Sequence, residues 1–396
     1  MNSPRVAVLM HNLGGGLETV VLNQVRGLTH YPYEIDLVLD RADGLDAAKI
    51  PPKVRIIDLK TPISPNFKSA LALIPPLIRY LRQEKPIALF SHLIFVNVVT
   101  AIARTLARFP THLTLIEHNL LFQKPGRSNE PSSKLLPLLM RGLYPKADRV
   151  VAVSKDMAST LEQWLHFPSG KIDVIYNPAL DRDFAAKAKA PLEHPWFAPS
   201  APPVFLGVGR LEKAKDFPTL LRAFARLRQQ REAKLILLGE GKERPALETS
   251  IEQLGLESEV SLPGFTPNPY AYMSRARACV LSSRWEGLPT VLIEALACGC
   301  QVVATDCPYG PREILDSGKY GRLVPVEDVE ALAEAMQLAI DRPLDTELLE
   351  RRALDFGIDR AVTQYLDAIE SDLLPKSGFK ASLTSAFRQA QSTTQS

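Results

Sequence analysis

The chain has 396 residues, of which 46% are hydrophobic and 23% are charged, and its formal net charge is +3. This length exceeds what one hydrophobic core usually organises, so we expect two domains of ordinary globular composition. The first apolar run has six residues and is followed by glycines rather than by a cleavage site, and the longest apolar span, residues 93–103, is well short of the ~20 residues that cross a bilayer. We therefore expect neither a signal peptide nor a transmembrane helix.

Short apolar runs alternate with helical patterns through the first half of the chain. The predicted strands are 5–10, 34–39, 54–59, 87–92, 112–119, 149–154 and 172–178, and the helical patterns between them include 17–29, 69–84 and 155–165. Apolar runs of this kind are typical of strands that are buried on both faces. The alternation therefore predicts α/β units with a doubly wound parallel sheet.

An Ala- and Pro-rich stretch, residues 186–203, interrupts the alternation, and we interpret it as a linker. The pattern resumes with predicted strands at 204–211, 234–241, 259–265, 278–283, 300–306 and 321–326. We expect an N-terminal domain at 1–185 and a C-terminal domain at 204–375, whose last helix is able to pack back on the N-terminal domain. The polar residues 376–396 are expected to form a mobile tail.

The four cysteines fall within 29 residues and lack the paired spacing of a zinc site: Cys279, Cys298, Cys300 and Cys307. We expect them to be buried thiols, and we expect no metal site.

Ligands of doubly wound sheets usually bind beyond the carboxyl ends of the strands, so residues directly after the strands are candidates. Gly14, Gly15 and Gly16 follow the first strand and precede a helix, an arrangement that suits an anion but is equally that of a plain turn. A dinucleotide fingerprint would need its third glycine at Thr19, which disfavours an oxidoreductase.

Two cations follow the first strand of the second half. Arg210 offers a planar fork and Lys215 a point charge just before a helix, and together they suit a diphosphate. Further glycine turns follow the next strands, at Gly239 with Gly241 and in "LPGF". Several turns of this kind on one edge of a sheet indicate a ligand site.

The stretch "SSRWEGLPTVLIEALACG", residues 282–299, contains an apolar helix that we expect to begin at Leu288 or Pro289. Its polar side chains, Thr290 and Glu294, are four residues apart and share one face. A carboxylate in a buried helix needs donors from the protein or from a ligand, and sugar hydroxyls would supply them.

Glu286 lies before this helix, beside the free N–H groups of Gly287 and Leu288. Glu286 and Glu294, set in "RWEGLPTVLIEALACGCQVVATD", resemble the signature of the retaining glycosyltransferases of family 4, which have the GT-B fold of two doubly wound domains facing across a cleft. The resemblance covers nearly the whole chain through "GGGLE", "EHN", "VAVSKDMASTL", "VIYNP", "GVGRLEKAKDF", "LLGEG" and "LPGF", in the family's order.

The resemblance implies a donor-binding site made of residues that follow strands: Gly15, Gly16, Arg210, Lys215, Gly239, Phe265, Glu286, Gly287, Leu288 and Glu294. Arg210 and Lys215 would hold the diphosphate of the donor. Glu294 would bind the ribose, Glu286 would bind the donor sugar, and the main chain near Phe265 would contact the base.

The resemblance also implies catalytic roles for His118, Glu286, Arg210 and Lys215, without a metal or cofactor, because cationic side chains and helix N-termini would stabilise the leaving diphosphate. For His118 alone, a core histidine is the alternative. Both glutamates already have binding roles, so we expect a front-face route in which the departing phosphate takes the acceptor's proton.

The stretch "DCPYGPREIL" resembles members that build bacterial surface polysaccharides, lipopolysaccharide cores or lipid-linked oligosaccharides. We therefore expect a hexosyltransferase that moves a hexose or N-acetylhexosamine from a UDP-sugar to a glycan or lipid-linked acceptor, with GDP-mannose as an open alternative. The chain departs from the common family pattern in "GLP" and at Gln301, and both changes are tolerable.

Residues 60–149 are strongly basic, with 13 Lys or Arg against four Asp or Glu. The cations around its apolar runs are Lys68, Arg79, Arg82, Lys85, Lys124, Arg127, Lys134 and Arg141. Such a surface fits a cytoplasmic protein that contacts the anionic inner face of the plasma membrane. A solvated helix face is an equal alternative. We expect no nucleic acid, because no nucleic-acid motif accompanies the charge.

Two other classes of protein stay open. A nucleotide-sugar epimerase or hydrolase would turn over the donor without an acceptor. A non-catalytic sugar-nucleotide-binding protein would normally have lost some of the four residues that this chain retains: Arg210, Lys215, Glu286 and Glu294.

Overall fold

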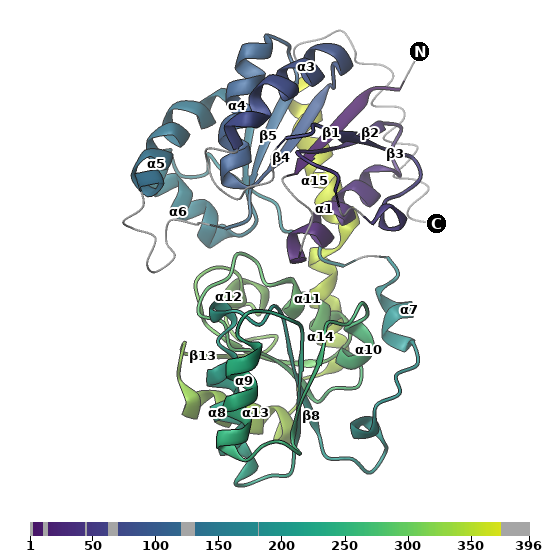
Figure 1. Ribbon diagram of the computed structural model, residues 1–396, viewed down its shortest axis with the longest axis vertical. Helices are drawn as coiled ribbons and strands as arrows, with labels where there is room; N and C mark the ends of the chain where they lie inside the picture. Colours follow the sequence, from purple (N-terminus) through teal and green to yellow (C-terminus); the bar gives the residue numbers. More distant parts are fainter. Residues whose placement is uncertain are drawn as a thin grey trace. The chain divides into compact units, whose positions relative to one another are not determined.

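The computed structural model describes residues 3–10, 15–43, 46–61, 70–119, 131–180 and 182–373, with only the backbone at 131–135. The expected tail at 376–396 and the cations Lys68, Lys124 and Arg127 lie outside the described residues. The chain forms two compact units: unit 1 is Met1–Pro178 with Ile358–Ser396, and unit 2 is Ala179–Gly357. Figure 1 shows each unit as a sheet with helices on its faces.

Unit 1 is built on a seven-stranded parallel sheet in the order β3-β2-β1-β4-β5-β6-β7. Its strands are β1 (Arg5–Met10), β2 (Glu34–Leu39), β3 (Val54–Asp58), β4 (Ala88–His92), β5 (His112–Glu117), β6 (Arg149–Ala152) and β7 (Asp173–Val174). Each of the seven predicted strands is present. The last is shorter than its predicted span, 172–178, and lies at the edge of the sheet, where it pairs with β6.

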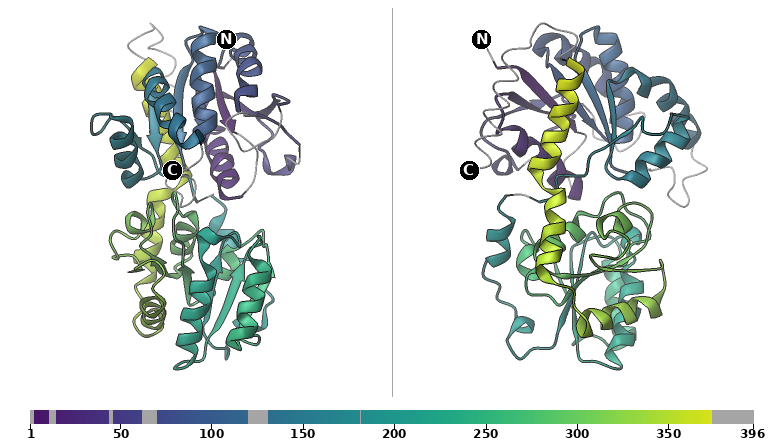
Figure 2. Two further views of the ribbon diagram at one scale, coloured as in Figure 1. Left: turned by 60° about the vertical axis from the view of Figure 1, so that its left-hand side comes forward. Right: turned by 180° about the vertical axis from the view of Figure 1, so that it is seen from behind.

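The α-helices described in unit 1 are α1 (Gly15–Leu28), α3 (Ile74–Glu84), α4 (Ile94–Ala107), α5 (Pro131–Leu143), α6 (Lys155–Leu165) and α15 (Ile358–Leu373). Helices α3 and α4 pack against each other on one face of the sheet, and α15 packs against α1 on the other (Figures 1 and 2). Helix α15 buries an apolar face that includes Ile358, Val362 and Leu366, residues spaced by four along the helix. The last described helix therefore completes the first unit.

Unit 2 is built on a six-stranded parallel sheet in the order β10-β9-β8-β11-β12-β13. Its strands are β8 (Val204–Val208), β9 (Lys234–Leu238), β10 (Val260–Gly264), β11 (Ala278–Leu281), β12 (Gln301–Thr305) and β13 (Arg322–Val324). Its α-helices are α7 (Phe184–Lys189), α8 (Phe217–Arg228), α9 (Arg244–Leu254), α10 (Tyr270–Met273), α11 (Thr290–Ala297), α12 (Pro311–Ile314), α13 (Val329–Asp341) and α14 (Thr346–Ala353). Two parallel sheets covered by helices confirm the predicted fold class.

The core of unit 2 lies between the sheet and the helices α8, α9 and α13. Phe205 of β8, Phe224 of α8 and Met336 of α13 are fully buried there. Helix α11 packs with α10 and α14 instead. This packing fixes the first turns of α8 and α11 at the carboxyl edge of the sheet, where the candidate site lies.

Residues 186–203, interpreted from the sequence as a linker, belong to unit 2 in the structure. Helix α7 packs on α10, and the carbonyl oxygens of Lys187 and Ala188 accept hydrogen bonds from Asn268 at 2.9 Å and Ser274 at 2.8 Å. None of the helices among the described residues is long and apolar enough to cross a membrane.

Candidate active site

The loops that follow β8, β9 and β10 are hydrogen-bonded to one another at the carboxyl edge of the second sheet. The main-chain N–H of Gly209 donates to Leu238 at 3.0 Å, that of Leu211 donates to Glu240 at 2.9 Å, and that of Gly239 donates to Gly264 at 2.8 Å. The predicted glycine turns therefore form one connected edge. Their backbone positions are fixed by these bonds.

Gly239 has a structural reason to be glycine. Its φ is +142°, and a Cβ at this position would overlap the carbonyl oxygen of Gly209. A side chain would push the loop after β8 away from the loop after β9. Gly239 thus supports the loop that carries Arg210 and Lys215.

Lys215 and Glu286 form an ion pair at this edge. The Lys215 Nζ lies 2.6 Å from Oε1 of Glu286, and the two side chains are 22% and 12% exposed. The hydroxyl of Ser283, a fully buried residue, donates to the same oxygen at 2.6 Å. Among the described residues, Oε2 of Glu286 has no hydrogen-bond partner, so this oxygen is available to a ligand.

Arg210 is placed differently from Lys215 although both lie in the loop after β8. Its side chain is 71% exposed and forms an ion pair with Glu212 at 3.1 Å. Phe265, which follows β10, is also exposed, at 77%. The structure therefore joins Lys215 to Glu286 directly and leaves Arg210 and Phe265 on the surface of unit 2.

Helix α11 begins at Thr290, a residue or two later than predicted, with Pro289 at the preceding position. Its six apolar residues are buried, while Thr290 and Glu294 are half-buried, as the four-residue spacing predicts. Burial and, second, the nearby Glu294 raise the pKa of the Cys279 and Cys298 thiols to about 12. These thiols are therefore protonated at neutral pH.

The predicted donor segment Gly287–Leu288 packs against Gly310, which precedes α12. Gly310 has a φ of +99°, and a Cβ on it would lie 3.1 Å from the Cα of Leu288 and would overlap the ring of Pro289. Sequence reasoning missed Gly310. The signal for it is the Gly-Pro pair in "YGPRE", which is typical of a tight turn into a helix.

His118 follows β5 in unit 1 and is 8% exposed. Its Nε2 lies 2.8 Å from Nδ1 of His92, and the two rings stack with centroids 5.1 Å apart. Burial lowers the pKa of His118 to about 4, although the side chain of Asn177 acts in the opposite direction. His118 is therefore neutral at physiological pH. No motif marked His92. Asn177 lies in the motif "VIYNP", but only the fold brings these two residues beside His118.

Glu117 is a fully buried carboxylate next to His118 in the chain. It accepts hydrogen bonds from Nδ2 of Asn97 at 2.8 Å and from the hydroxyl of Tyr144. Burial raises the pKa of Glu117 to about 7, while these two hydrogen bonds act to lower it. Glu117 was also missed, since the motif "EHN" draws attention to its histidine.

Gly15 is the first residue of α1, and Gly16 is the second. A Cβ on Gly16 would meet no heavy atom within 4 Å among the described residues. Packing in unit 1 therefore does not require glycine at 16, and its expected place near phosphates stays a prediction. No group of three or more His, Cys, Asp or Glu side chains suited to a metal occurs in the described parts of the chain.

Two parallel sheets covered by helices are the architecture of the GT-B class of glycosyltransferases. Family models match both halves of the chain: Glycosyltransferase Family 4 matches residues 14–179, and Glycosyl transferases group 1 matches residues 192–353. The chain belongs to the family 4 glycosyltransferases. It is an enzyme that transfers a sugar from a nucleotide-sugar.

One relative is N-acetylgalactosamine-N,N'-diacetylbacillosaminyl-diphospho-undecaprenol 4-alpha-N-acetylgalactosaminyltransferase from Campylobacter jejuni. It is 29% identical over 353 residues, which are 85% of this chain and 90% of the relative. Another is the lipopolysaccharide core biosynthesis glycosyltransferase LpsE from Rhizobium meliloti, which is 34% identical over 154 residues, 39% of this chain and 44% of the relative.

A similar solved structure is that of Anabaena Alr3699/HepE in complex with UDP and glucose. It has a TM-score of 0.74 and 22% sequence identity, and the match covers 93% of this chain and 100% of that chain. At this identity the likeness shows the fold, which agrees with the two parallel sheets described above.

Proposed function

We propose that the protein transfers a hexose or N-acetylhexosamine from a UDP-sugar to a lipid-linked glycan acceptor, with retention at the anomeric carbon. The observation that carries the proposal is the Lys215–Glu286 pair at 2.6 Å on the carboxyl edge of the second sheet. The relative from Campylobacter jejuni, whose name states transfer of N-acetylgalactosamine to a diphospho-undecaprenol glycan, supports this class of acceptor. The HepE structure with UDP and glucose supports the donor class.

A sugar diphosphate has groups that suit both members of the Lys215–Glu286 pair. The Lys215 ammonium is a point charge that attracts a phosphate oxygen. Oε2 of Glu286 can accept a hydrogen bond from a hydroxyl of the attached sugar, while Oε1 stays bonded to Lys215 and Ser283. The phosphate and the sugar are adjacent in the donor, as the two side chains are adjacent here. We assign Glu294, which lies on α11 after Glu286, to the ribose hydroxyls.

We propose a front-face mechanism. The acceptor oxygen bonds to the anomeric carbon as the bond from that carbon to the phosphate oxygen breaks, and the acceptor's proton moves to the departing phosphate. Glu286 and Glu294 both have binding roles in this assignment, which favours the front-face route over a covalent intermediate. Lys215 and Arg210 would stabilise the leaving diphosphate in place of a metal. We assign His118 to contact with the donor sugar as a neutral group.

We propose that the surface formed by α3 and the end of α4 contacts anionic lipid that carries the acceptor. Leu71, just before α3, and Leu106 of α4 are exposed at 40% and 52%. Arg82 donates to the carbonyl oxygen of Leu106 at 3.1 Å. The exposed cations on α3 and at the ends of the two helices are Arg79, Arg82, Lys85 and Arg108. The acid of α3, Glu84, is held by Arg55 at 2.6 Å, so it does not offset these cations. A basic surface with exposed leucines favours an anionic membrane over solvent alone.

The test uses the purified full chain, UDP-N-acetylgalactosamine, UDP-glucose or GDP-mannose as donor, and undecaprenyl-diphosphate-linked glycan as acceptor, with EDTA present. Release of UDP together with labelled lipid-linked product is expected. Lys215→Ala and Glu286→Gln should lose most of this activity, whereas Lys213→Ala, at a neighbouring exposed lysine, should retain it.

Three outcomes would contradict the proposal. Turnover of the donor without an acceptor would indicate an epimerase or a hydrolase. Use of GDP-mannose alone would reject the UDP donor. Binding of UDP without turnover of any donor and acceptor pair would indicate a sugar-nucleotide-binding protein without catalysis.

A further inference from the structure

The residue that follows Lys215 has an unusual backbone conformation. Asp216 has φ +47° and ψ 44°, the left-handed region, and it is 2% exposed. Besides glycine, Asp and Asn adopt this conformation most readily, because their short polar side chains can form local hydrogen bonds. The side chain of Asp216 makes such contacts.

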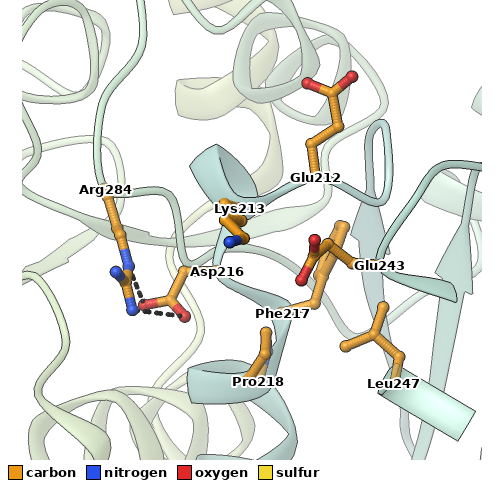
Figure 3. A pocket seen from close by; sticks show the side chains of 8 residues that line it. All are labelled: Glu212, Lys213, Asp216, Phe217, Pro218, Glu243, Leu247 and Arg284. Atoms are coloured by element: carbon orange, nitrogen blue, oxygen red, sulfur yellow. Dashed lines mark hydrogen bonds and ion pairs between the residues drawn. The ribbon is translucent and has the colours of Figure 1, made fainter. Parts of the chain in front are cut away.

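The carboxylate of Asp216 faces the guanidinium of Arg284, as Figure 3 shows. Nε of Arg284 lies 3.2 Å from Oδ2 of Asp216, and the hydroxyl of Thr219 donates to the same oxygen at 2.8 Å. Arg284 also lies 2.8 Å from Glu327, in the loop after β13. The arginine therefore bridges the loop before α8 and a second loop at the same edge.

The main chain reinforces this bridge on both sides of Lys215. The N–H of Arg284 donates to the carbonyl oxygen of Ala214 at 2.8 Å. The hydroxyl of Ser282 donates to the carbonyl oxygen of Lys215 at 2.8 Å. Residues 214, 215 and 216 are thus each held by the loop 282–284, which also leads to Glu286.

Asp216 and Arg284 face a pocket that is distinct from the Lys215–Glu286 contact. The pocket is lined by residues of the loop before α8 and of the first turns of α8 and α9, and neither Lys215 nor Glu286 is among them (Figure 3). The Asp216–Arg284 pair thus contacts the loop before α8 on the side of this pocket. It has no direct contact with the oxygen of Glu286 that is available to a ligand.

We propose that Asp216 and Arg284 are positioning residues that hold Lys215 at the site of the donor diphosphate. The inference rests on the proposed function. Without this pair, residues 213–216 keep the bonds at Ala214 and Lys215 but lose the contact at Asp216, so Lys215 spends less time against Glu286 and the phosphate. The affinity for the diphosphate then decreases, although neither Asp216 nor Arg284 contacts the ligand.

The test is a double-mutant cycle on the affinity for UDP, measured by isothermal titration calorimetry. Arg284→Gln should weaken UDP binding about tenfold, and Lys215→Ala should weaken it at least as much. The double variant should bind no more weakly than Lys215→Ala, because the pair acts through that lysine. Arg284→Lys should restore part of the affinity. Asp216→Gly, which keeps the left-handed backbone and removes the carboxylate, should behave as Arg284→Gln.

Arg226→Gln is the matched control, since Arg226 forms an ion pair with Glu330 at 3.0 Å on the surface of the same unit. Both arginine variants are compared by thermal unfolding, which separates a folding defect from a change in binding. UDP affinity in Arg284→Gln equal to that of Arg226→Gln would reject the positioning role, as would additive losses in the double variant. Unchanged affinity in Lys215→Ala would reject the diphosphate site itself, and the positioning role with it.

Discussion

Gly27 of α1 lies directly against Ile358, the first residue of α15. A Cβ on Gly27 would lie 2.5 Å from Cγ2 of Ile358 and 2.6 Å from Cγ2 of Val362. Two helices at opposite ends of the chain therefore pack in close contact at a glycine. The core of unit 1 includes residues that are more than 300 positions apart in the sequence.

Substitution of Gly27 by Leu should destabilise unit 1. The added side chain has no space between the helices, and overpacking of this kind costs about 1–3 kcal/mol. Urea unfolding followed by circular dichroism should show a lower midpoint with little change in slope. Gly142→Ala is the control, because a Cβ there meets no atom of the described residues within 4 Å and α5 gains a better helix former. Equal midpoints for Gly27→Leu and Gly142→Ala would contradict the close packing.

Asp372, in the last turn of α15, should make the stability of unit 1 depend on pH. Asp372 accepts hydrogen bonds from Nε of Arg149 at 2.7 Å and from Nε2 of His112 at 3.0 Å. Burial acts to raise the pKa of Asp372, but these partners outweigh it and the net pKa is lowered. A lowered carboxyl pKa contributes stability above the unfolded pKa of ~4, and this contribution is lost as the pH falls through the folded pKa.

Asp372→Asn should therefore lower the melting temperature at pH 7 and have a smaller effect near pH 3. Thermal unfolding of the two proteins at both pH values is the measurement. Asp367→Asn, at an exposed position on the same helix, should change neither value appreciably. A loss in Asp372→Asn that is equal at the two pH values would show that the ion pair is not responsible.

Much of the fold could be predicted because it depends on local pattern. Apolar runs identified all strands in both described sheets, and the helix expected just after Lys215 is α8, which begins at Phe217. The apolar run with Thr290 and Glu294 on one face predicted the burial of α11. These features depend on neighbours within a few residues, which the sequence displays directly.

The parts that could not be predicted depend on contacts between distant residues. The resemblance placed Lys215 and Glu286 at one donor site, but nothing in the sequence predicts a direct ion pair between two side chains 71 positions apart. The contact between His92 and His118 arises because β4 and β5 are neighbours in the sheet. Asp216 forms an ion pair with Arg284, and no local signal in the sequence links the two.

The buried Glu117 should make unit 1 less stable as the pH rises. Its pKa is about 7 in the folded protein, above the ordinary value of a glutamate, so the folded state holds a proton that the unfolded state releases between about pH 4.5 and 7. Glu117→Gln keeps an acceptor for Tyr144 and removes the charge. The stability of Glu117→Gln relative to the parent protein should therefore rise between pH 5 and pH 8, by on the order of 2 kcal/mol.

Urea unfolding at pH 5 and pH 8 measures this difference, and comparing the variant with the parent cancels the contribution of His118, whose lowered pKa acts in the opposite direction. Glu162→Gln, at another buried glutamate of unit 1, serves as a comparison. A difference between Glu117→Gln and the parent that is the same at the two pH values would contradict the raised pKa.

Ser283 should affect the use of the donor through Glu286. Its hydroxyl donates to Oε1 of Glu286 at 2.6 Å, and its own carbonyl oxygen accepts from Thr305 at 2.6 Å, so the residue fixes the carboxylate at the end of β11. Removal of one hydrogen bond to a charged group costs about 1.5–3 kcal/mol, although part of this is regained if water enters. We expect Ser283→Ala to lower kcat/KM for the donor about tenfold, with little change in KM for the acceptor.

Steady-state kinetics with each substrate varied in turn is the measurement. Ser250→Ala is the control, because the Ser250 hydroxyl donates to the carbonyl oxygen of Ala246 on the exposed face of α9. Ser283→Thr, which retains a hydroxyl, should recover activity if the side chain fits. An equal loss for donor and acceptor would indicate a general disturbance of the loop. Full activity in Ser283→Ala would show that Lys215 alone is enough to hold Glu286 in place.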